Sequence, residues 1–336
     1  MFWESDIKAL ALAREKFAAI KAYVKEREKL FFVAKIVIAL GLLAYLIDRV
    51  GSVEIANVFA SANYYYVALA GVLLVPNIFF QYARWKALVA RTLRVEDTRV
   101  VWRSLFYGLA GGAFTPARVG EYVGRGVAFR DRSLLEVSIV TFIDKFFTLV
   151  VIAFTGATSA ILFLAWRYHI SPPFAVALFV ALGGATAFVF FAVSSDRFWR
   201  EVILPALTSV TWMRPFVERL RALRRLDRRT LTLSGAYSFG LYAVMLLQYT
   251  ALAAAFSGDA DFLWFAWGGA LTFFVKALVP SISLGDVGVR EAASIYFLSQ
   301  FGVSDEIGFN AAFTLFIFNV LIPSLIGFAL LFKRNK

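Results

Sequence analysis

Long apolar stretches constrain this chain more than any other feature of its sequence. Of its 336 residues, 60% are hydrophobic, and the mean hydropathy is +0.72. A helix needs about twenty apolar residues to cross the ~30 Å hydrocarbon core of a bilayer. Six candidate spans are residues 31–47, 64–82, 137–166, 174–193, 231–256 and 307–332. We therefore expect an all-α, polytopic membrane protein, whose third span is long enough that it must tilt or break.

The basic residues divide the connecting segments into two groups. The N-terminal segment, residues 84–103 and residues 195–230 are rich in Lys and Arg, whereas residues 48–63, 167–173 and 257–261 are nearly free of them. Cytoplasmic loops of membrane proteins carry an excess of Lys and Arg. This pattern predicts a protein of the cytoplasmic membrane with both termini in the cytoplasm. It also accounts for the net charge of +12 without nucleic acid as a partner.

Two segments are predicted to lie on the membrane surface as amphipathic helices. In residues 1–30 an apolar stripe is bordered by basic residues, and the arginine-rich loop at residues 195–230 repeats apolar residues at helical spacing. Residues 31–336 are expected to form a single transmembrane domain. Aromatic rings at span ends favour the headgroup layer. We expect that position for Tyr64, Tyr65, Tyr66, Trp85, Trp166 and Trp264.

Two further hydrophobic stretches are interrupted by proline and by charge, unlike a span. The first, residues 100–126, breaks at Pro116, and the second, residues 262–300, breaks at Pro280. Each is predicted to form a re-entrant hairpin, the first inserted from the cytoplasm and the second from outside. Small residues four apart permit close helix approach in the first stretch. These residues are Gly108, Gly112, Gly120 and Gly124.

The order of spans and hairpins predicts an inverted repeat. A span, a hairpin and a span follow one another in the first half, about residues 64–166, and again in the second half, about residues 231–332. Inverted repeats are typical of transporters, whose substrate sites lie at the repeat interface near the bilayer midplane. Irregular backbone at that depth is tolerated only where protein buries it or a water-filled cavity faces it. The two hairpins are therefore predicted to line a central cationic cavity.

Charged residues gather in both hairpins. Arg118, Glu121 and Arg125 stand at i, i+3 and i+7 and so share one helix face, and Asp286 and Arg290 are at i and i+4. A charge near the bilayer centre costs roughly 2.5–3.5 kcal/mol on insertion scales, so it needs compensation. That compensation is either mutual salt bridging or an anionic ligand, because guanidinium groups bind phosphate bidentately. The candidate substrate-binding residues are Arg118, Glu121, Arg125, Lys276, Asp286, Arg290 and Glu291.

Three charged residues lie within or beside apolar runs. Asp144 and Lys145, inside the third span, form either an internal pair or a proton-coupling acid with its partner. Both are candidate ion-coupling residues. Lys276 either snorkels its ammonium group to the interface or contacts a headgroup.

The sequence offers few residues for catalysis or metal binding. It has no cysteine and a single histidine, His169, so thiol catalysis is excluded and neither a Cys/His metal site nor a cofactor is expected. Asp259 and Asp261, in a predicted outer loop, are an acidic pair able to hold a divalent cation. The same pair beside Gly258 also fits an ordinary turn.

The paired motifs resemble those of a known family. "TPARVGE", residues 115–121, and "PSISLGDVGVREAA", residues 280–293, are similar to the patterns P-x-R-x-G-E and P-x-x-x-G-G-x-G-x-R-E. These patterns belong to the lysylphosphatidylglycerol synthase transmembrane region family, also described as flippase-like integral membrane proteins. The similarity covers roughly residues 30–332. The chain has Asp286 where the family more often has Gly, and Ala117 where Gly is usual.

The resemblance implies movement of a charged lipid between leaflets. Bacterial members are associated with aminoacyl phospholipids, and suggested archaeal relatives with polyprenyl-phosphate-linked sugars. In members that also make lysyl lipid, a separate soluble domain follows the membrane part. Here the sequence ends four residues past the last predicted span, so no synthase activity is expected.

These features lead to two hypotheses about function, both with membrane lipids as partners. The first is a lipid flippase or transporter that is not an enzyme. An anionic lipid (polyprenyl phosphate, polyprenyl-phosphate sugar or an aminoacyl or other phospholipid) would bring its phosphate into the cationic cavity. The alternative is a membrane-embedded glycosyl or aminoacyl transferase that uses a lipid-phosphate substrate.

Overall fold

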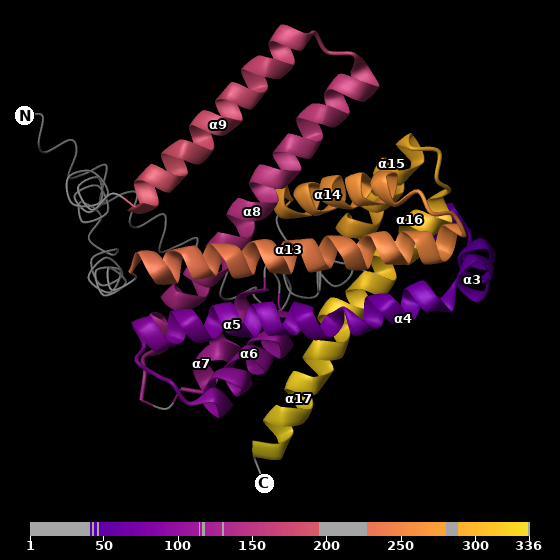
Figure 1. Cartoon of the computed structure of the whole chain (residues 1–336). Helices are drawn as coiled ribbons and strands as arrows, with labels where there is room; N and C mark the ends of the chain where they lie inside the picture. Colours follow the sequence, from indigo (N-terminus) through magenta and orange to yellow (C-terminus); the bar gives the residue numbers. More distant parts are fainter. Residues whose placement is uncertain are drawn as a thin grey trace, which may run out of the picture.

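The chain is almost entirely helical over the part that the structure describes. This computed structural model describes residues 41, 44, 45, 47–113, 115, 118–129, 131–194, 227–279 and 288–334. The expected all-α fold is confirmed (Figure 1). The elements are α3 (Ser52–Ala60), α4 (Tyr64–Val72), α5 (Leu74–Thr92), α6 (Thr98–Ala113), α7 (Val119–Val127), α8 (Leu134–Tyr168), α9 (Pro172–Ser194), α13 (Arg228–Ser257), α14 (Phe262–Leu278), α15 (Val289–Gln300), α16 (Asp305–Phe316), the π-helix η6 (Ile317–Leu321) and α17 (Ile322–Arg334).

Five helical stretches among the described residues are long and apolar enough to cross a membrane. They are Tyr64–Thr92, Leu134–Tyr168, Pro172–Val189, Arg228–Ser257 and Asp305–Lys333. They correspond to the second to sixth predicted spans, so the prediction of a multi-pass membrane protein is confirmed. The first predicted span, residues 31–47, falls mostly outside the described residues. The predicted surface helix at residues 1–30 and most of the arginine-rich loop at residues 195–230 also lie outside them.

The last residues of that loop already belong to α13, which begins at Arg228 rather than at residue 231. Asp227 caps this helix, because its Oδ1 accepts hydrogen bonds from the backbone N–H of Thr230 at 3.1 Å and from the Thr230 hydroxyl at 2.5 Å. These bonds, which favour the ionised carboxylate, hold the pKa of Asp227 below its ordinary value. The start of the span is thus fixed by a local cap.

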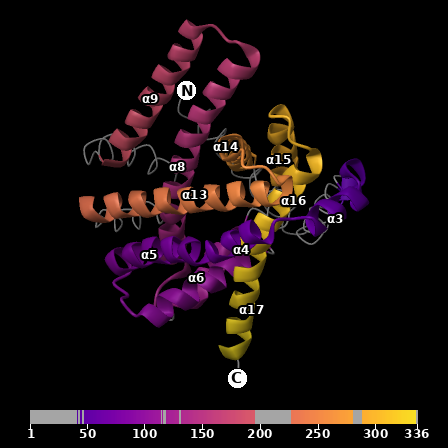
Figure 2. The same ribbon diagram turned by 45° about the vertical axis from the view of Figure 1, so that its right-hand side comes forward.

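The third predicted span is one uninterrupted helix, α8, of 35 residues. At 1.5 Å per residue it is about 52 Å long, which exceeds a hydrocarbon core of ~30 Å. The length of this span predicted that it must either tilt or break, and the helix does not break. Its far half packs on α14 and α15, where the Phe163 ring meets the rings of Trp267 and Phe297 edge-on. Helix α9 stands away from the other described helices apart from α8 (Figures 1 and 2). None of the residues in Pro172–Val189 is buried.

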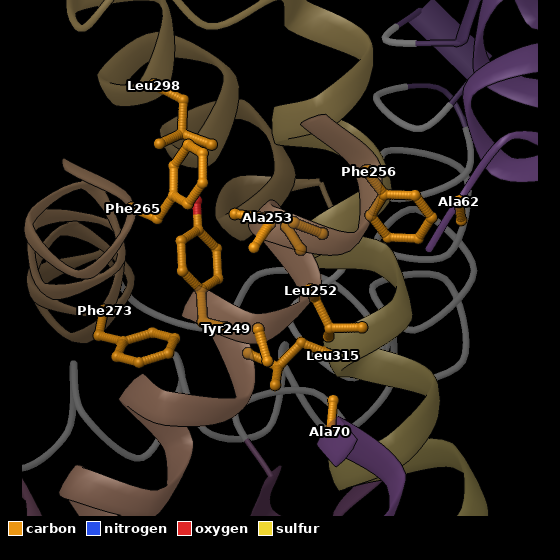
Figure 3. Packing of buried hydrophobic residues seen from close by; sticks show 14 of the residues in the cluster. Ala62, Ala70, Tyr249, Leu252, Ala253, Phe256, Phe265, Phe273, Leu298 and Leu315 are labelled. Atoms are coloured by element: carbon orange, nitrogen blue, oxygen red, sulfur yellow. The ribbon is translucent and has the colours of Figure 1, made fainter. Parts of the chain in front are cut away.

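Helix α13 lies at the centre of the described part and packs against α4, α5, α8, α14 and α16. Apolar side chains from these helices surround Tyr249 (Figure 3). The Tyr249 ring meets the ring of Phe273 edge-on, and its hydroxyl lies 2.6 Å from the Ser294 Oγ. The buried tyrosine thus packs its ring while its polar atom keeps a hydrogen bond.

Contacts between α5 and α13 show the direction from which each hairpin inserts. The Asn77 Nδ2 donates to the Gln248 Oε1 at 3.1 Å, and at the other end the Arg91 Nη2 lies 3.8 Å from the Asp227 Oδ2. The two helices are therefore antiparallel. Since α6 follows the end of α5 and α14 follows the end of α13, the hairpins α6–α7 and α14–α15 start from opposite ends of this pair (Figure 1). This agrees with the expected opposite insertion, while the inverted repeat itself stays a prediction.

The last span joins the two hairpins. Its first part, α16, packs on α15, where the Ser294 Oγ donates to the Gly308 carbonyl oxygen at 2.6 Å. Its last part, α17, packs on α6, where the Ser324 Oγ donates to the Leu109 carbonyl oxygen at 3.1 Å. The π-helix η6 lies between these two parts and is held to α13 by Asn319, whose Nδ2 donates to the Gln248 Oε1 at 3.0 Å.

Glycines allow the backbones of α6 and α7 to pack in direct contact. A Cβ on Gly124 would lie 2.2 Å from the Tyr107 carbonyl oxygen, and a Cβ on Gly120 would lie 2.3 Å from the Gly111 carbonyl oxygen. No side chain fits at such distances. The close approach predicted from the glycine spacing is confirmed, and it holds the two arms of the first hairpin together.

We expect Gly124→Ala to lower the apparent melting temperature of the detergent-solubilised protein. The added methyl group has only backbone to displace, and overpacking of this kind costs typically about 1–3 kcal/mol. Gly183→Ala is the matched control, because Gly183 is also helical and nothing lies within 4 Å of its added Cβ. The control should melt at or slightly above the wild-type temperature, since Ala favours helix over Gly. Equal melting of the two variants would contradict the backbone contact.

Candidate functional site

Helix α7 begins at an unusual turn. Arg118 is its N-cap and has a left-handed backbone, with φ 54° and ψ 27°, a region uncommon for residues other than glycine. The Thr115 Oγ1 stabilises this turn, because it donates to the Gly111 carbonyl oxygen at 2.8 Å and accepts from the Gly120 N–H at 2.7 Å. This bridge from the end of α6 to the first turn of α7 fixes where the Arg118 side chain begins.

Asp144, in the first third of α8, binds two guanidinium groups. Its Oδ1 lies 2.6 Å from the Arg84 Nε of α5, and its Oδ2 lies 3.0 Å from the Arg125 Nη1 of α7. All three side chains are at most 2% exposed. Arg84 also donates to the hydroxyls of Ser238 and Thr148. Both carboxylate oxygens of Asp144 are therefore used to join three helices.

Glu121, one turn before Arg125 on α7, binds the remaining cations. Its Oε1 lies 2.9 Å from the Arg125 Nη2 and 2.6 Å from the Lys145 Nζ. Its Oε2 lies 3.5 Å from the Arg118 Nε, an ion-pair contact without hydrogen-bond geometry. Glu121 and Asp144 together with their partners are called the ion network below. Its members are Arg84, Arg118, Glu121, Arg125, Asp144 and Lys145.

Arg125 passes between a glycine and an aromatic ring on its way to the two carboxylates. A Cβ on Gly108 would lie 2.4 Å from the Arg125 Cγ, so the absence of a side chain there leaves room for the arginine. The guanidinium group lies over the Trp85 ring, 4.2 Å from its centroid, and this cation–π contact is strongest where water is excluded. Trp85 is completely buried. The expectation that it anchors in the headgroup layer is wrong, because its ring is the support of Arg125.

The ion network has more positive than negative side chains. Two carboxylates are shared by four cations, and both carboxylates are almost fully buried. Arg84 and Arg125 are buried with them, whereas Arg118 is 26% exposed and Lys145 is 33% exposed. The excess positive charge therefore lies at the accessible edge of the network, next to the start of α7.

The structure brings together the first-hairpin residues predicted from the sequence. Arg118, Glu121 and Arg125 meet as expected from their spacing, although Arg118 caps the helix instead of lying within it. Asp144 and Lys145 do not form the internal pair considered above, because adjacent residues on a helix point about 100° apart. Each instead binds a different member of the network. Their role in ion coupling stays a prediction.

In the second hairpin, Glu291 fixes the start of α15. Its Oε2 accepts from the Gly288 N–H at 2.6 Å, and its Oε1 lies 3.0 Å from the Arg290 Nη2. The Arg290 guanidinium also lies over the Phe316 ring, 5.4 Å from its centroid. Arg290 and Glu291 are both buried. In both hairpins a buried glutamate and a neighbouring arginine thus stand at the start of the returning helix, although Arg118 of the first hairpin is partly exposed.

Other predicted residues of the second hairpin are placed only in part. Asp286 and Pro280 lie outside the described residues. Lys276 is half-buried in the last turn of α14. Among the described residues no hydrogen bond or salt bridge links the two motifs, so their meeting in a central cavity stays a prediction.

Sequence reasoning missed Arg84, which it counted among the basic residues of a cytoplasmic segment. A signal was present, because Asn77, Gln81, Arg84 and Leu88 repeat at helical spacing within an apolar helix. The side chain of an arginine on such a face points into protein rather than to water. Its partner on α8 is 60 residues away along the chain and could not be read from spacing.

The acidic pair at Asp259 and Asp261 lies in an exposed turn between α13 and α14. The Asp259 N–H donates to the Ser257 Oγ at 3.1 Å, and Asp261 is the N-cap of α14. Over the described part of the chain, no three His, Cys, Asp or Glu side chains gather at metal-binding distances. The geometry of this turn gives the transferase alternative no further support.

The fold and the ion network define a class: a multi-pass helical membrane protein that buries charged side chains in a broken hairpin. The chain belongs to the lysylphosphatidylglycerol synthase TM region family, whose model matches residues 32–327. The family resemblance inferred from the two motifs is therefore confirmed, and the protein is one of a lipid-related membrane family. No curated protein matches the chain significantly.

We expect Arg84→Met to destabilise the protein strongly. Removing one partner of a buried ion pair leaves an uncompensated charge and costs about 3–5 kcal/mol. Arg91→Met is the matched control, because Arg91 lies two turns further along α5 and its contact with Asp227 is about half exposed. Exposed pairs are worth about 0–1 kcal/mol. Thermal unfolding in detergent compares the two, and a loss for Arg84→Met no larger than that for Arg91→Met would contradict the buried network.

Proposed function

We propose that this chain moves an anionic, phosphate-containing lipid between the leaflets of the cytoplasmic membrane. Polyprenyl phosphate, polyprenyl-phosphate sugars and phospholipids, aminoacylated or not, share the phosphate that the site would bind. The proposed role is that of a transporter and involves no bond making, so the protein would not be an enzyme. The predicted cytoplasmic location of both termini belongs to this proposal.

The observation that carries the proposal is the position of the excess positive charge. Glu121 and Asp144 each contact more than one cation, so the partly exposed ends of Arg118 and Lys145 are not fully compensated within the network. An anion in low-dielectric surroundings gains more from such groups than it would in water. A phosphate at the edge of the network would complete the charge balance.

Dehydrating the headgroup is the main barrier to moving a charged lipid across hydrocarbon. Guanidinium groups at the broken end of a membrane-embedded hairpin lower that barrier, because they replace water as hydrogen-bond donors to phosphate. The acyl or prenyl chains can remain in the hydrocarbon while the headgroup crosses. The family membership supports a lipid as the transported substrate. The lipid headgroup has to be identified by experiment.

Energy coupling is part of the proposal and is assigned to the same network. Lipid exchange that proceeds without a gradient would make the protein a scramblase. Dependence on a proton gradient would assign coupling to Glu121, Asp144 or Lys145. Among these, Asp144 has both oxygens bound to guanidinium groups, so Glu121, whose Oε2 accepts no hydrogen bond, and the partly exposed Lys145 are the better candidates.

We expect the purified full chain, reconstituted in vesicles, to speed leaflet exchange of fluorescent phosphatidylglycerol. Arg118→Gln should slow this exchange about tenfold or more, because a hydrogen bond to a charged group contributes about 1.5–3 kcal/mol and 1.4 kcal/mol is tenfold. Arg167→Gln is the control, since Arg167 is exposed and bonds to Gln300 away from the network. The proposal is wrong if wild-type vesicles exchange lipid no faster than empty ones, or if Arg118→Gln matches wild type.

A further inference from the structure

A cavity of about 380 Å³ lies at the base of the first hairpin, at the end of α6 opposite to Arg118. Val100, Arg103 and Tyr107 line one wall. They stand at i, i+3 and i+7 and therefore share one face of α6. The opposite wall is the short segment between α7 and α8, which includes Phe129 and Arg132. The cavity is thus separate from the accessible edge of the ion network.

Aromatic residues form the inner wall of this cavity and connect it to the network. Phe129 and Tyr107 are both buried. The Phe129 ring meets the Trp85 ring edge-on, with centroids 6.4 Å apart, and Trp85 supports Arg125. The Phe129 and Trp85 rings therefore lie between the cavity and the buried guanidinium group. A ligand in the cavity would touch apolar rings on its inner side.

The rim of the cavity is charged. Arg103 and Arg132 are exposed on opposite walls, and neither forms a salt bridge with another described residue. Asp131 also lines the cavity and makes no salt bridge within the described ranges. This contrasts with the ion network, where each guanidinium group contacts a carboxylate. Two guanidinium groups on opposite walls suit a phosphate, and Asp131 offers an acceptor for a hydroxyl of the same headgroup.

We propose that this cavity binds the headgroup of a phosphate-bearing amphiphile that also carries hydroxyl donors. Arg103 and Arg132 hold the phosphate, Asp131 accepts from a hydroxyl, and Val100 contacts the first apolar carbons. The cavity lies at the side where the first hairpin starts, which is the predicted cytoplasmic side. Its role as the place where the lipid is loaded rests on the proposed function, whereas the binding itself does not.

Binding is tested on the purified full chain by native mass spectrometry with phosphatidylglycerol. The Arg103→Gln/Arg132→Gln variant should bind this lipid at least about tenfold more weakly than wild type, because both charge-assisted contacts to phosphate are lost. The control is Arg94→Gln/Arg99→Gln, which removes two exposed arginines of the same region that do not line the cavity. The control should bind within about twofold of wild type. The proposed site would be wrong if both variants lost affinity for phosphatidylglycerol equally, or if Arg103→Gln/Arg132→Gln, the cavity variant, lost none.

Inorganic phosphate distinguishes a lipid from a free anion. Val100→Ser should weaken phosphatidylglycerol and leave competition by inorganic phosphate unchanged, since only the lipid touches Val100. Displacement of the lipid by an equimolar amount of inorganic phosphate would overturn the assignment to an amphiphile. Phosphatidylcholine, whose headgroup lacks a hydroxyl, should bind more weakly than phosphatidylglycerol, and equal binding would overturn the role of Asp131.

The leaflet-exchange assay separates this site from the proposed function. If the cavity variant loses binding while wild-type vesicles show no exchange, the site stands and the proposed function fails. If wild type exchanges lipid and the cavity variant exchanges it at the same rate when phosphatidylglycerol is scarce, the loading role is wrong. Slower exchange by the cavity variant only at low lipid content supports loading through this cavity.

Discussion

Two buried carboxylates, Glu121 and Asp144, impose the constraint on which the described structure depends. An ionised carboxylate removed from water is stable only when it is paired and hydrogen-bonded. Three helices supply the partners: α5 through Arg84, α7 through Arg125 and α8 through Lys145. The position of the first hairpin against α5 and α8 therefore follows from charge compensation as well as from apolar packing.

Several packing features follow from that compensation. Because Gly108 has no side chain, the aliphatic part of the Arg125 side chain fits beside it, and the Arg125 guanidinium group packs on the Trp85 ring. Gly124 brings the two arms of the hairpin into backbone contact, so Glu121 reaches its partners from a short helix. The same kind of residue pair recurs at the start of α15, where Glu291 binds Arg290. In both hairpins an acidic side chain near the helix start fixes an arginine that would otherwise be free to move.

The sequence predicted the membrane-spanning helices and the residues of the first motif. It predicted less well which side chains from different helices contact one another. Span length and hairpin breaks depend on local composition, so five described spans and the meeting of Arg118, Glu121 and Arg125 were foreseen. Arg84 was assigned to a cytoplasmic segment and Trp85 to the headgroup layer, because helical spacing shows which face a residue occupies and not which distant helix covers it. For the same reason, the two partners of Asp144, Arg84 and Arg125, could not be inferred from its position beside Lys145.

A double-mutant cycle between Arg125 and Asp144 tests the central claim most directly. The unfolding free energies of Arg125→Met, Asp144→Leu and the double variant are measured against wild type in detergent. If the two groups compensate each other in a buried network, the double variant is less destabilised than the sum of the single variants by about 1 kcal/mol or more. Additive losses would show that the two charges do not meet, and would contradict the account.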